Sequence, residues 1–276
     1  MAVITISREL AALGNEIAAE LVKLLNYRLV DKSTLEDRIK SYGVVDHTLE
    51  KFDERKPSFW ASLSQDRDDY LHYLKTAVLA EAGQGNCIII GRGAAMLLKN
   101  VPAVLSVFLV APQDIRVERV KSYFHCDDRR ARQIIDQSDH DREGFHRYFF
   151  DAKWEEPANY HLTLNTGRQP PVVLAEIIKH LLTSSVNEET EAQNAERLAE
   201  MILGQRIKHH ILYEKEVPIH FLETSVSGKK VILYGVTNSP ALVEAALTTA
   251  REAITEDSGY TVESEIQAVQ EFSVLH

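Results

Sequence analysis

The stretch "VITISRELAALGNEIAAELVKLL", residues 3–25, joins a short apolar run to a helical pattern. Val3, Ile4 and Ile6 are typical of a strand that is buried in a core. Further along, apolar residues recur at the spacing of one helix face: Leu10, Leu13, Ile17, Leu21 and Leu24. A strand that leads through a loop into a helix is the order of elements in a phosphate-binding unit.

The loop in this unit lacks most of the residues that bind phosphate. A phosphate loop reads G-x-x-x-x-G-K-[ST], and in the window from Arg8 to Glu16 only Gly14 falls near a required glycine. Backbone N–H groups converge on an anion where glycines allow positive φ, and this conformation costs roughly 1–2 kcal/mol for a residue with a Cβ. Two interpretations stay open: a degenerate phosphate loop, or a helix that begins early, near Glu9, and packs on the sheet.

The lysine and the Ser/Thr that end such a loop are replaced by Gly14 and Asn15. The lysine would neutralise charge on a transferred phosphoryl group, and the hydroxyl would hold Mg²⁺. Loss of one preorganised donor of this kind lowers the rate by about 10²–10³. Arg8 is the candidate for a replacement positive charge from the other side of the loop.

Strand and helix patterns alternate over the first two thirds of the chain, which indicates a doubly wound α/β domain with a parallel sheet. Several strand patterns are continuous apolar runs, as expected for strands that are buried on both faces. The predicted strands are 2–6, 27–31, 87–91, 104–110 and 160–165, and the predicted helices are 14–25, 69–83, 112–122 and 172–183. The polar insertions 32–66 and 121–158 are where a substrate cap and a lid would lie.

A second module follows a predicted linker. Residues 184–194, "SSVNEETEAQN", have no apolar periodicity and are interpreted as a linker between a domain 1–183 and a domain 195–276. In the second domain the patterns predict the order α-β-β-α-β, with elements at 195–205, 216–226, 229–236, 240–254 and 260–271.

Composition narrows the class of protein. The chain of 276 residues is 45% hydrophobic and 26% charged, with a mean hydropathy of −0.21, which is typical of soluble globular proteins. Its apolar runs are shorter than the roughly 18 residues that span a bilayer, and its start has no signal-peptide pattern. Cys87 and Cys126 make neither a disulfide framework nor a zinc site, so we expect a reducing cytoplasm. A formal charge of −10 argues against nucleic-acid binding.

Three stretches resemble the cytidylate-kinase-like family. "ITISREL…GNEIAAELVKLLNYRLVDK" is similar to the family opening I-T-I-S-R-E-Y-G-S-G-G-R-E-I, and "NCIIIGRGAAMLLKNVPAVLSVFLVAPQDIRVERV" and "DHDREGFHRYFFDAKWEEPANYHLTLNTGR" resemble later parts of it. The resemblance covers nearly all of residues 1–183. It implies a P-loop nucleoside monophosphate kinase fold, with a central parallel sheet, a monophosphate-binding insertion and a lid.

The resemblance also implies roles for loop residues. It assigns nucleotide binding, with ATP and Mg²⁺ as cofactors, to Ser7, Arg8, Gly14, Asn15 and Glu16. The family's glycine-serine-glycine element is replaced here by Ala11-Ala12-Leu13.

Three further residues would contact the acceptor. Arg92, in "GRGA", lies where cytidylate kinases carry a G-R-D arginine that contacts the monophosphate, although Gly93 replaces the aspartate. Asp31 matches a position that faces the monophosphate, and Asp139 matches one in the lid. The alternative for Arg92 is a helix-start residue that pairs with a neighbouring acid.

The lid motif of cytidylate kinases, R-D-x-x-D-x-x-R, is partly kept, as Asp136, Asp139 and Arg142, with Ile135 for the first arginine. Arg8, Arg92 and Arg142 would neutralise phosphoryl oxygens as the catalytic cations. Alternatively, Asp139 and Arg142 form a surface ion pair worth a few tenths of a kcal/mol. The arginines of "DDRRARQ" are more often a solvated face than a phosphate clamp.

The C-terminal module resembles a BON domain, in the residues "VSGKKVILYGVTNSPALVEAALTTAREA", especially Gly228, Gly235 and the helix after Pro240. This resemblance implies contact with lipid or envelope surfaces, but the mixed charges Glu244 and Arg251 on that helix do not support membrane binding. Regulation or homo-oligomerisation is the alternative.

Two functions follow, and a third, a purely structural assembly protein, would apply if no nucleotide binds. One is phosphoryl transfer from ATP to a nucleoside monophosphate or a similar small acceptor. The other is a catalytically inactive kinase fold that senses a nucleotide or another phosphorylated small molecule and signals through the BON-like module.

Overall fold

The computed structural model describes residues 2–44, 64–254 and 259–269. The chain divides into two compact units, residues 1–195 and 196–276, and each is described by itself. Residues 45–63 of the insertion expected at 32–66, and residues 270–271 of the last expected strand, lie outside the described part.

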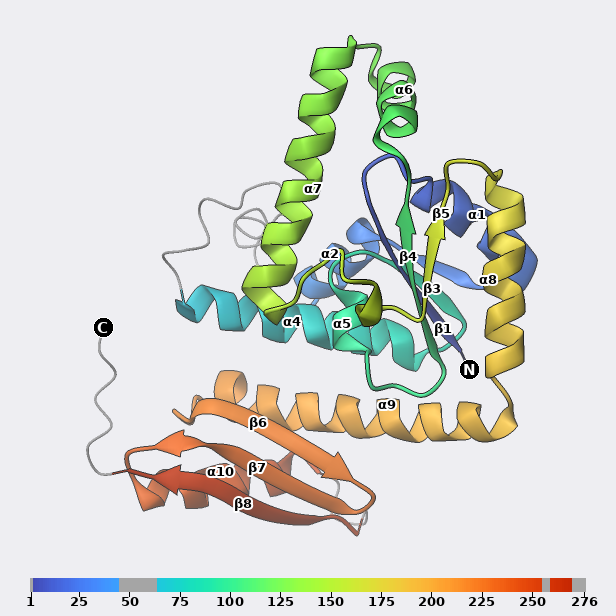
Figure 1. Cartoon of the computed structure of the whole chain (residues 1–276). Coiled ribbons are helices and arrows are strands. Elements are labelled where there is room, and N and C mark those ends of the chain that lie inside the picture. The colour runs from blue at the N-terminus through green and yellow to red at the C-terminus, as the bar shows by residue number, and fades with distance from the viewer. Residues whose placement is uncertain (1, 45–63, 255–258, 270–276) are drawn as a thin grey trace. The chain divides into compact units, whose positions relative to one another are not determined.

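A parallel sheet forms the centre of the first unit (Figure 1). Within the described part of this unit it has five strands in the order β2-β3-β1-β4-β5, each parallel to its neighbours. The strands are β1 (Val3–Arg8), β2 (Arg28–Val30), β3 (Cys87–Ile90), β4 (Val104–Val110) and β5 (Leu162–Asn165). The chain thus has the α/β fold of P-loop kinases, with β1 in the middle of the sheet. In such sheets, ligands bind outside the carboxyl ends of the strands where the strand order reverses.

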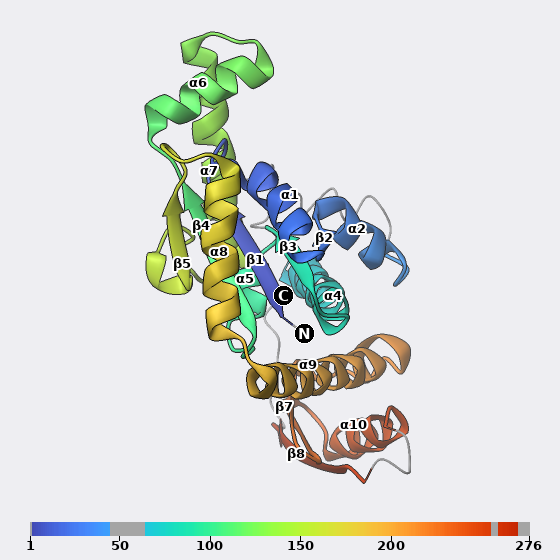
Figure 2. The ribbon, with the colours of Figure 1, turned by 90° about the vertical axis from the view of Figure 1, so that its right-hand side faces the viewer.

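Helices cover both faces of this sheet. They are α1 (Gly14–Leu25), α2 (Lys32–Lys40), α4 (Ser64–Gly83), α5 (Ala94–Leu97), α6 (Gln113–Phe124), α7 (Asp128–Phe150), the 3₁₀ turn η2 (Pro157–Asn159) and α8 (Pro171–Ser185). Helices α1 and α8 lie side by side on one face (Figure 2), where Ile17 and Ile178 pack against Ile4 and Ile6. Val3 is completely buried on the opposite face, so β1 has buried apolar side chains on both faces of the sheet.

The insertion expected at 121–158 is mostly helical. It contains the end of α6 and all of α7, which together form a hairpin beyond the carboxyl end of β4 (Figures 1 and 2). The aromatic residues near the end of α7 pack internally, since Phe145 and Phe149 are buried with ring centroids 4.8 Å apart. We call α7 the lid helix, because it lies in the insertion where the sequence predicts a lid.

The second unit has the element order α-β-β-α-β that the sequence predicted. Its elements are the latter part of α9 (Glu188–His209), the π-helical turn η3 (His210–Glu214), β6 (His220–Ser227), β7 (Lys230–Thr237), α10 (Pro240–Glu252) and β8 (Thr261–Ala268). Strand β7 pairs antiparallel with β6 and parallel with β8. The core of this unit includes Ile207, Leu233 and Ala250, all of them completely buried.

The stretch 184–194 differs from the expected linker. Helix α8 continues to Ser185, and α9 begins at Glu188. Asn187 and Thr190 cap α9 reciprocally, because each backbone N–H donates to the other side chain at 2.8 Å. Acidic residues in the first turn also favour this helix. These signals lie in polar residues, so apolar periodicity did not reveal them.

In the described residues, no helix combines the length and the hydrophobicity that crossing a membrane requires.

Candidate functional site

The loop after β1 passes through the left-handed region at two residues that are not glycine. Helix α1 begins at Gly14, so the interpretation with an early helix near Glu9 is wrong. Ala11 and Leu13 have φ values of 61° and 60°, in the left-handed region. Each costs roughly 1–2 kcal/mol for a residue with a Cβ, so contacts elsewhere in the fold must hold the loop in this shape.

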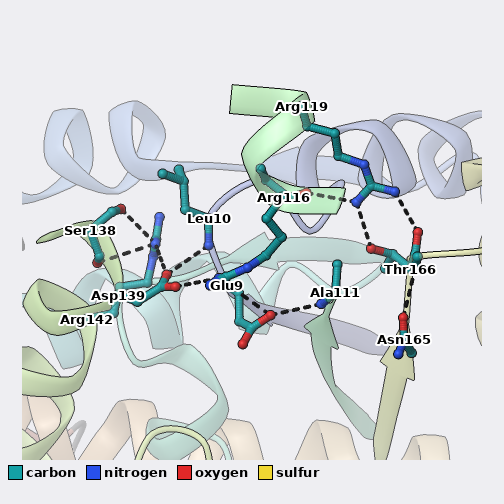
Figure 3. A network of polar contacts seen from close by, with 12 residues as sticks. Glu9, Leu10, Ala111, Arg116, Arg119, Ser138, Asp139, Arg142, Asn165 and Thr166 are labelled. Carbon is teal, nitrogen blue, oxygen red and sulfur yellow. Dashed lines mark hydrogen bonds and ion pairs between the residues drawn. The ribbon is translucent and has the colours of Figure 1, made fainter. Parts of the chain in front are cut away.

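Arg119 of α6 supplies one of these contacts. Its guanidinium donates to the Ala11 carbonyl at 2.9 Å, and to the carbonyl and hydroxyl of Thr166 at 2.7 and 3.2 Å (Figure 3). Thr166, after β5, is completely buried. One arginine thus ties the left-handed part of the loop to the segment between β5 and α8.

Arg8 fills the space where the lysine of a phosphate loop would begin. A Cβ on Gly14 would lie 2.8 Å from Cγ and 3.2 Å from Cδ of Arg8. Real Cβ atoms do not approach other atoms this closely, so a side chain at position 14 and the present Arg8 side chain exclude each other. The cationic side chain that borders this part of the loop therefore comes from the end of β1.

The lid helix is fastened to the loop through Asp139. One oxygen of this carboxylate accepts from the Leu10 amide at 2.9 Å and from Arg142 at 3.1 Å, and the other accepts from Arg116 (Figure 3). Arg142 also donates to the Ser138 hydroxyl at 2.8 Å. The side chains of Asp139 and Arg142 are only 14% and 13% exposed. The interpretation of this pair as a surface ion pair is therefore wrong.

Glu9 completes this charged cluster. Its carboxylate accepts from the Ala111 amide at 2.8 Å and lies 3.5 Å from Arg116. Burial raises the pKa of Glu9 and of Asp139 above the usual range of carboxyl groups, in spite of the neighbouring arginines. The two carboxylates of the cluster balance the charges of Arg116 and Arg142.

A cavity of about 470 Å³ lies beside the loop at the carboxyl ends of the strands. It is lined by Arg8, Asn15, Leu29, Asp31, Lys32, Ser33, Glu36 and Ile90. Asp31 caps α2, and one of its oxygens accepts from the Thr34 amide at 3.0 Å and from two hydroxyl groups. The Thr34 amide is the largest of the effects that lower the pKa of Asp31. Asp31 is thus a fixed, ionised carboxylate in the wall of the cavity.

Arg92 lies behind this wall. It is 3% exposed, has a left-handed φ of 52°, and donates to Glu36 at 2.8 Å. Arg92 thus pairs with an acid, which is one of the two interpretations of this residue. Its partner, Glu36, lines the cavity. Gly93, which replaces the family aspartate, has no room for a side chain, because a Cβ there would lie 2.2 Å from Phe150 of the lid helix.

The structure therefore groups the predicted site residues in two clusters. Arg8, Asn15 and Asp31 share the cavity, and Asp139 and Arg142 share the lid network.

Other predicted residues lie elsewhere. Ser7 is buried within β1, Gly14 lies under Arg8, and Glu16 is exposed in the first turn of α1. Neither Ser7 nor Glu16 is among the described residues that line the cavity. The arginines of "DDRRARQ" are exposed on α7, as a solvated face would be.

The sequence did not single out Glu36, Arg116 and Arg119 as site residues. Arg116 and Arg119 are three residues apart on the helix that follows β4. This spacing places them on neighbouring positions of one helix face and was the available signal.

The donors at this site fit a triphosphate. A left-handed loop directs backbone amides toward an anion, and Arg8 adds a cation beside it. For Mg²⁺, the side chains of Asn15 and Asp31 offer oxygen atoms at the cavity, and phosphate oxygens and water complete the shell of such ions. Within the described residues, no cluster of three or more His, Cys, Asp or Glu residues is arranged to hold a metal ion.

Comparison with known proteins agrees with the fold. The sequence model of the cytidylate kinase-like family matches residues 3–168. A solved structure of an uncharacterized protein from Eubacterium ventriosum is 19% identical, covers 67% of this chain and 99% of its own length, and has a TM-score of 0.53. Shikimate kinase from Bacteroides thetaiotaomicron is 17% identical over 66% of this chain and 98% of its own length, with a TM-score of 0.41. No curated protein sequence matches the chain.

Proposed function

Because the chain belongs to the cytidylate kinase-like family, we propose that it binds a nucleoside triphosphate over the loop between β1 and α1. It would transfer the terminal phosphoryl group to a nucleoside monophosphate or a similar small acceptor in the neighbouring cavity. The observation that carries this proposal is the position of Arg8, whose side chain fills the space of a residue-14 side chain on a loop that keeps its left-handed backbone.

Phosphoryl transfer depends mainly on positioning and charge neutralisation. In our proposal Arg8 and Arg142 neutralise phosphoryl oxygens, and Asp31 orients the acceptor. Arg92 would reach the acceptor phosphate only after exchanging Glu36 for it. Mg²⁺, held by the triphosphate together with Asn15 and Asp31, would supply further charge neutralisation.

The residues that line the cavity favour an acceptor that carries both charged and hydroxyl groups. Its walls carry the cations Arg8 and Lys32 and the anions Asp31 and Glu36. A volume of about 470 Å³ lies within the range of small-molecule sites. This balance of charge suits a nucleotide whose phosphate faces the cations and whose sugar hydroxyls face the carboxylates.

Calorimetric titration and a product assay test this proposal. The protein is titrated with ATP, with CMP, and with both, in the presence and absence of Mg²⁺, and transfer to CMP is followed by separation of the nucleotides. We expect Arg8→Ala to lower the transfer rate by about 10²–10³, as the loss of one preorganised donor does. Arg130→Ala, at an exposed position of α7, is the matched control. Absence of ATP binding to the unaltered protein would contradict the proposal.

A second candidate function is a silent sensor of nucleotides or other anions. The observation that favours it is the ion pair between Arg92 and Glu36, since an arginine that is 3% exposed and already neutralised is poorly placed to stabilise a transition state. This function predicts binding of ATP without turnover, and Glu36→Gln would then strengthen the binding of CMP. Turnover in the unaltered protein would rule it out.

The function of the C-terminal unit is a separate proposal. We propose a BON-like module, in a cytoplasmic protein that does not bind nucleic acid, and assign it a regulatory or oligomerisation role. Sedimentation of the full chain with and without ATP tests this role, because a nucleotide-dependent change of mass would support it.

A further inference from the structure

The carboxylate of Asp139 has the contacts that a bound phosphoryl group would have. Both of its oxygens accept hydrogen bonds: one from the Leu10 amide and Arg142, the other from Arg116. The donors come from the phosphate-type loop, the lid helix α7 and helix α6 (Figure 3). A backbone amide of such a loop and two guanidinium groups are the donors that bind phosphate in proteins.

The two arginines also carry buried N–H groups that the Asp139 carboxylate does not use. The Nε atoms of Arg116 and Arg142 are buried, and among the described residues neither has a hydrogen-bond partner. The Arg116 side chain is 9% exposed. A carboxylate offers two oxygen atoms, whereas a terminal phosphoryl group offers three and carries more charge. Burial without a partner is unfavourable for such groups, so the cluster is better matched to the larger anion.

The charges of the cluster lead to the same conclusion. Glu9 and Asp139 together balance Arg116 and Arg142, so the closed cluster is neutral. If the Asp139 side chain rotated away while α7 stayed in place, Glu9 would remain with both arginines. The site would then become positive beside the Leu10 amide. The burial that raises the pKa of Asp139 also indicates that this carboxylate is held in an unfavourable environment.

We propose that Asp139 is an internal competitor of the nucleotide: its carboxylate occupies a phosphoryl site formed by Leu10, Arg116 and Arg142, and it must leave before a nucleotide phosphate binds there. The Asp139–Leu10 contact joins α7 to the loop, and phosphate binding would exchange one anion for another. This inference rests on the proposed nucleotide-binding function.

Asp139→Asn in the full chain tests the competition, with Glu143→Gln as the matched control. Glu143 is on the same helix, and its side chain is 52% exposed. The probes are ATP with Mg²⁺ and inorganic tripolyphosphate, followed by calorimetry. Hydrogen exchange of the Leu10 amide reports the contact without any ligand. Asp139→Ser serves as a second variant if the asparagine protein does not fold.

We expect Asp139→Asn to bind both probes about tenfold more tightly, because a charged competitor is removed, and its Leu10 amide to exchange faster, while Glu143→Gln changes neither. Equal or weaker binding in Asp139→Asn, with binding in the unaltered protein, would overturn the competition and leave the nucleotide function intact. If no variant binds either probe, the nucleotide function fails. Hydrogen exchange of the Leu10 amide then tests separately whether Asp139 fastens the lid helix to the loop. If this amide exchanges at the same rate in Asp139→Asn as in the unaltered protein, the contact is refuted.

Discussion

The side chain of Arg8 and the backbone of Gly14 occupy adjoining space, so that a Cβ on Gly14 would lie 2.8 Å from Cγ of Arg8. The two positions stand six residues apart, at the end of β1 and the start of α1. In the G-x-x-x-x-G-K pattern, position 14 carries the lysine. In this chain the cationic side chain at this point therefore comes from the end of the strand, whereas the pattern places one at the start of the helix.

This relationship predicts coupling between positions 8 and 14. Gly14→Ala alone should destabilise the protein by roughly 1–2 kcal/mol, because the added methyl group overpacks against Arg8. In an Arg8→Ala background the same change should instead stabilise it by up to about 1 kcal/mol, since alanine favours a helix more than glycine does. Urea unfolding of the four proteins of this double-mutant cycle measures the coupling. Additive effects of the two substitutions would show that Arg8 does not fill the space above Gly14.

The left-handed loop predicts opposite effects of glycine at neighbouring positions. Ala11→Gly should leave stability unchanged or raise it by up to about 1 kcal/mol, because glycine relieves the strain of a φ of 61°. Ala12 is completely buried and is not among the residues with positive φ, so Ala12→Gly should destabilise the protein by about 1 kcal/mol. Thermal unfolding compares the two variants. A clear loss of stability in Ala11→Gly would be evidence against the strained loop.

Arg119 is expected to maintain the shape of the loop. Arg119→Gln removes three hydrogen bonds to Ala11 and Thr166 and should destabilise the protein by roughly 1–3 kcal/mol, as the loss of charge-assisted hydrogen bonds does. Hydrogen exchange should become faster in residues 10–13. Arg129→Gln, at an exposed position of α7, is the control. If exchange in the loop were unchanged, the loop would not need Arg119.

Glu81 is expected to make stability depend on pH. Its side chain is 3% exposed and accepts hydrogen bonds from Arg28 and Arg38 at 2.9 and 2.6 Å. Burial alone would raise the pKa of Glu81, but the two arginines hold it below the usual value of 4.5. A lowered pKa in the folded protein adds stability above the unfolded-state pKa, and this stability is lost as the pH falls through the folded-state value.

Glu81→Gln should therefore destabilise the protein by roughly 1–3 kcal/mol at neutral pH, and the difference should shrink as the pH falls below 4.5. The side chains of Arg28 and Arg38 are 43% and 38% exposed, so water weakens their ion pairs with Glu81 and lessens the loss of stability. Urea unfolding at neutral and acidic pH measures it, with Glu118→Gln as the control, since that side chain is 70% exposed. A difference that stayed constant with pH would refute the assignment.

The sequence allowed most of the first unit to be predicted. The strand at 104–110 and the helix at 14–25 have the predicted bounds, because the apolar pattern is a local signal. The strand is a continuous run that is buried on both faces, and the helix is buried on the face that its period marks. The capping residues of α9, Asn187 and Thr190, are also a local signal. Because they are polar, apolar periodicity does not detect them. The predicted linker therefore turned out to be helical over its second half.

The candidate site could be predicted only in part. Arg8 and Asp31 could be found because they stand at the ends of recognisable strands. Arg8 is the last residue of β1, and Asp31 directly follows β2. The partners of Arg92 and Asp139 could not be found in this way. Glu36 is 56 residues from Arg92, and Leu10 is 129 residues from Asp139, so no local pattern connects the members of either pair.

By itself, the sequence determined the alternation of strands and helices, the family, and the loss of the lysine from the loop. Only the tertiary structure decided the shape of that loop. Local preferences disfavour positive φ at Ala11 and Leu13. Contacts from Asp139 and from Arg119, which Thr166 holds in place, override them. These residues reach the loop only after the chain has folded, because the parallel sheet brings the segments after β4 and β5 to the carboxyl end of β1.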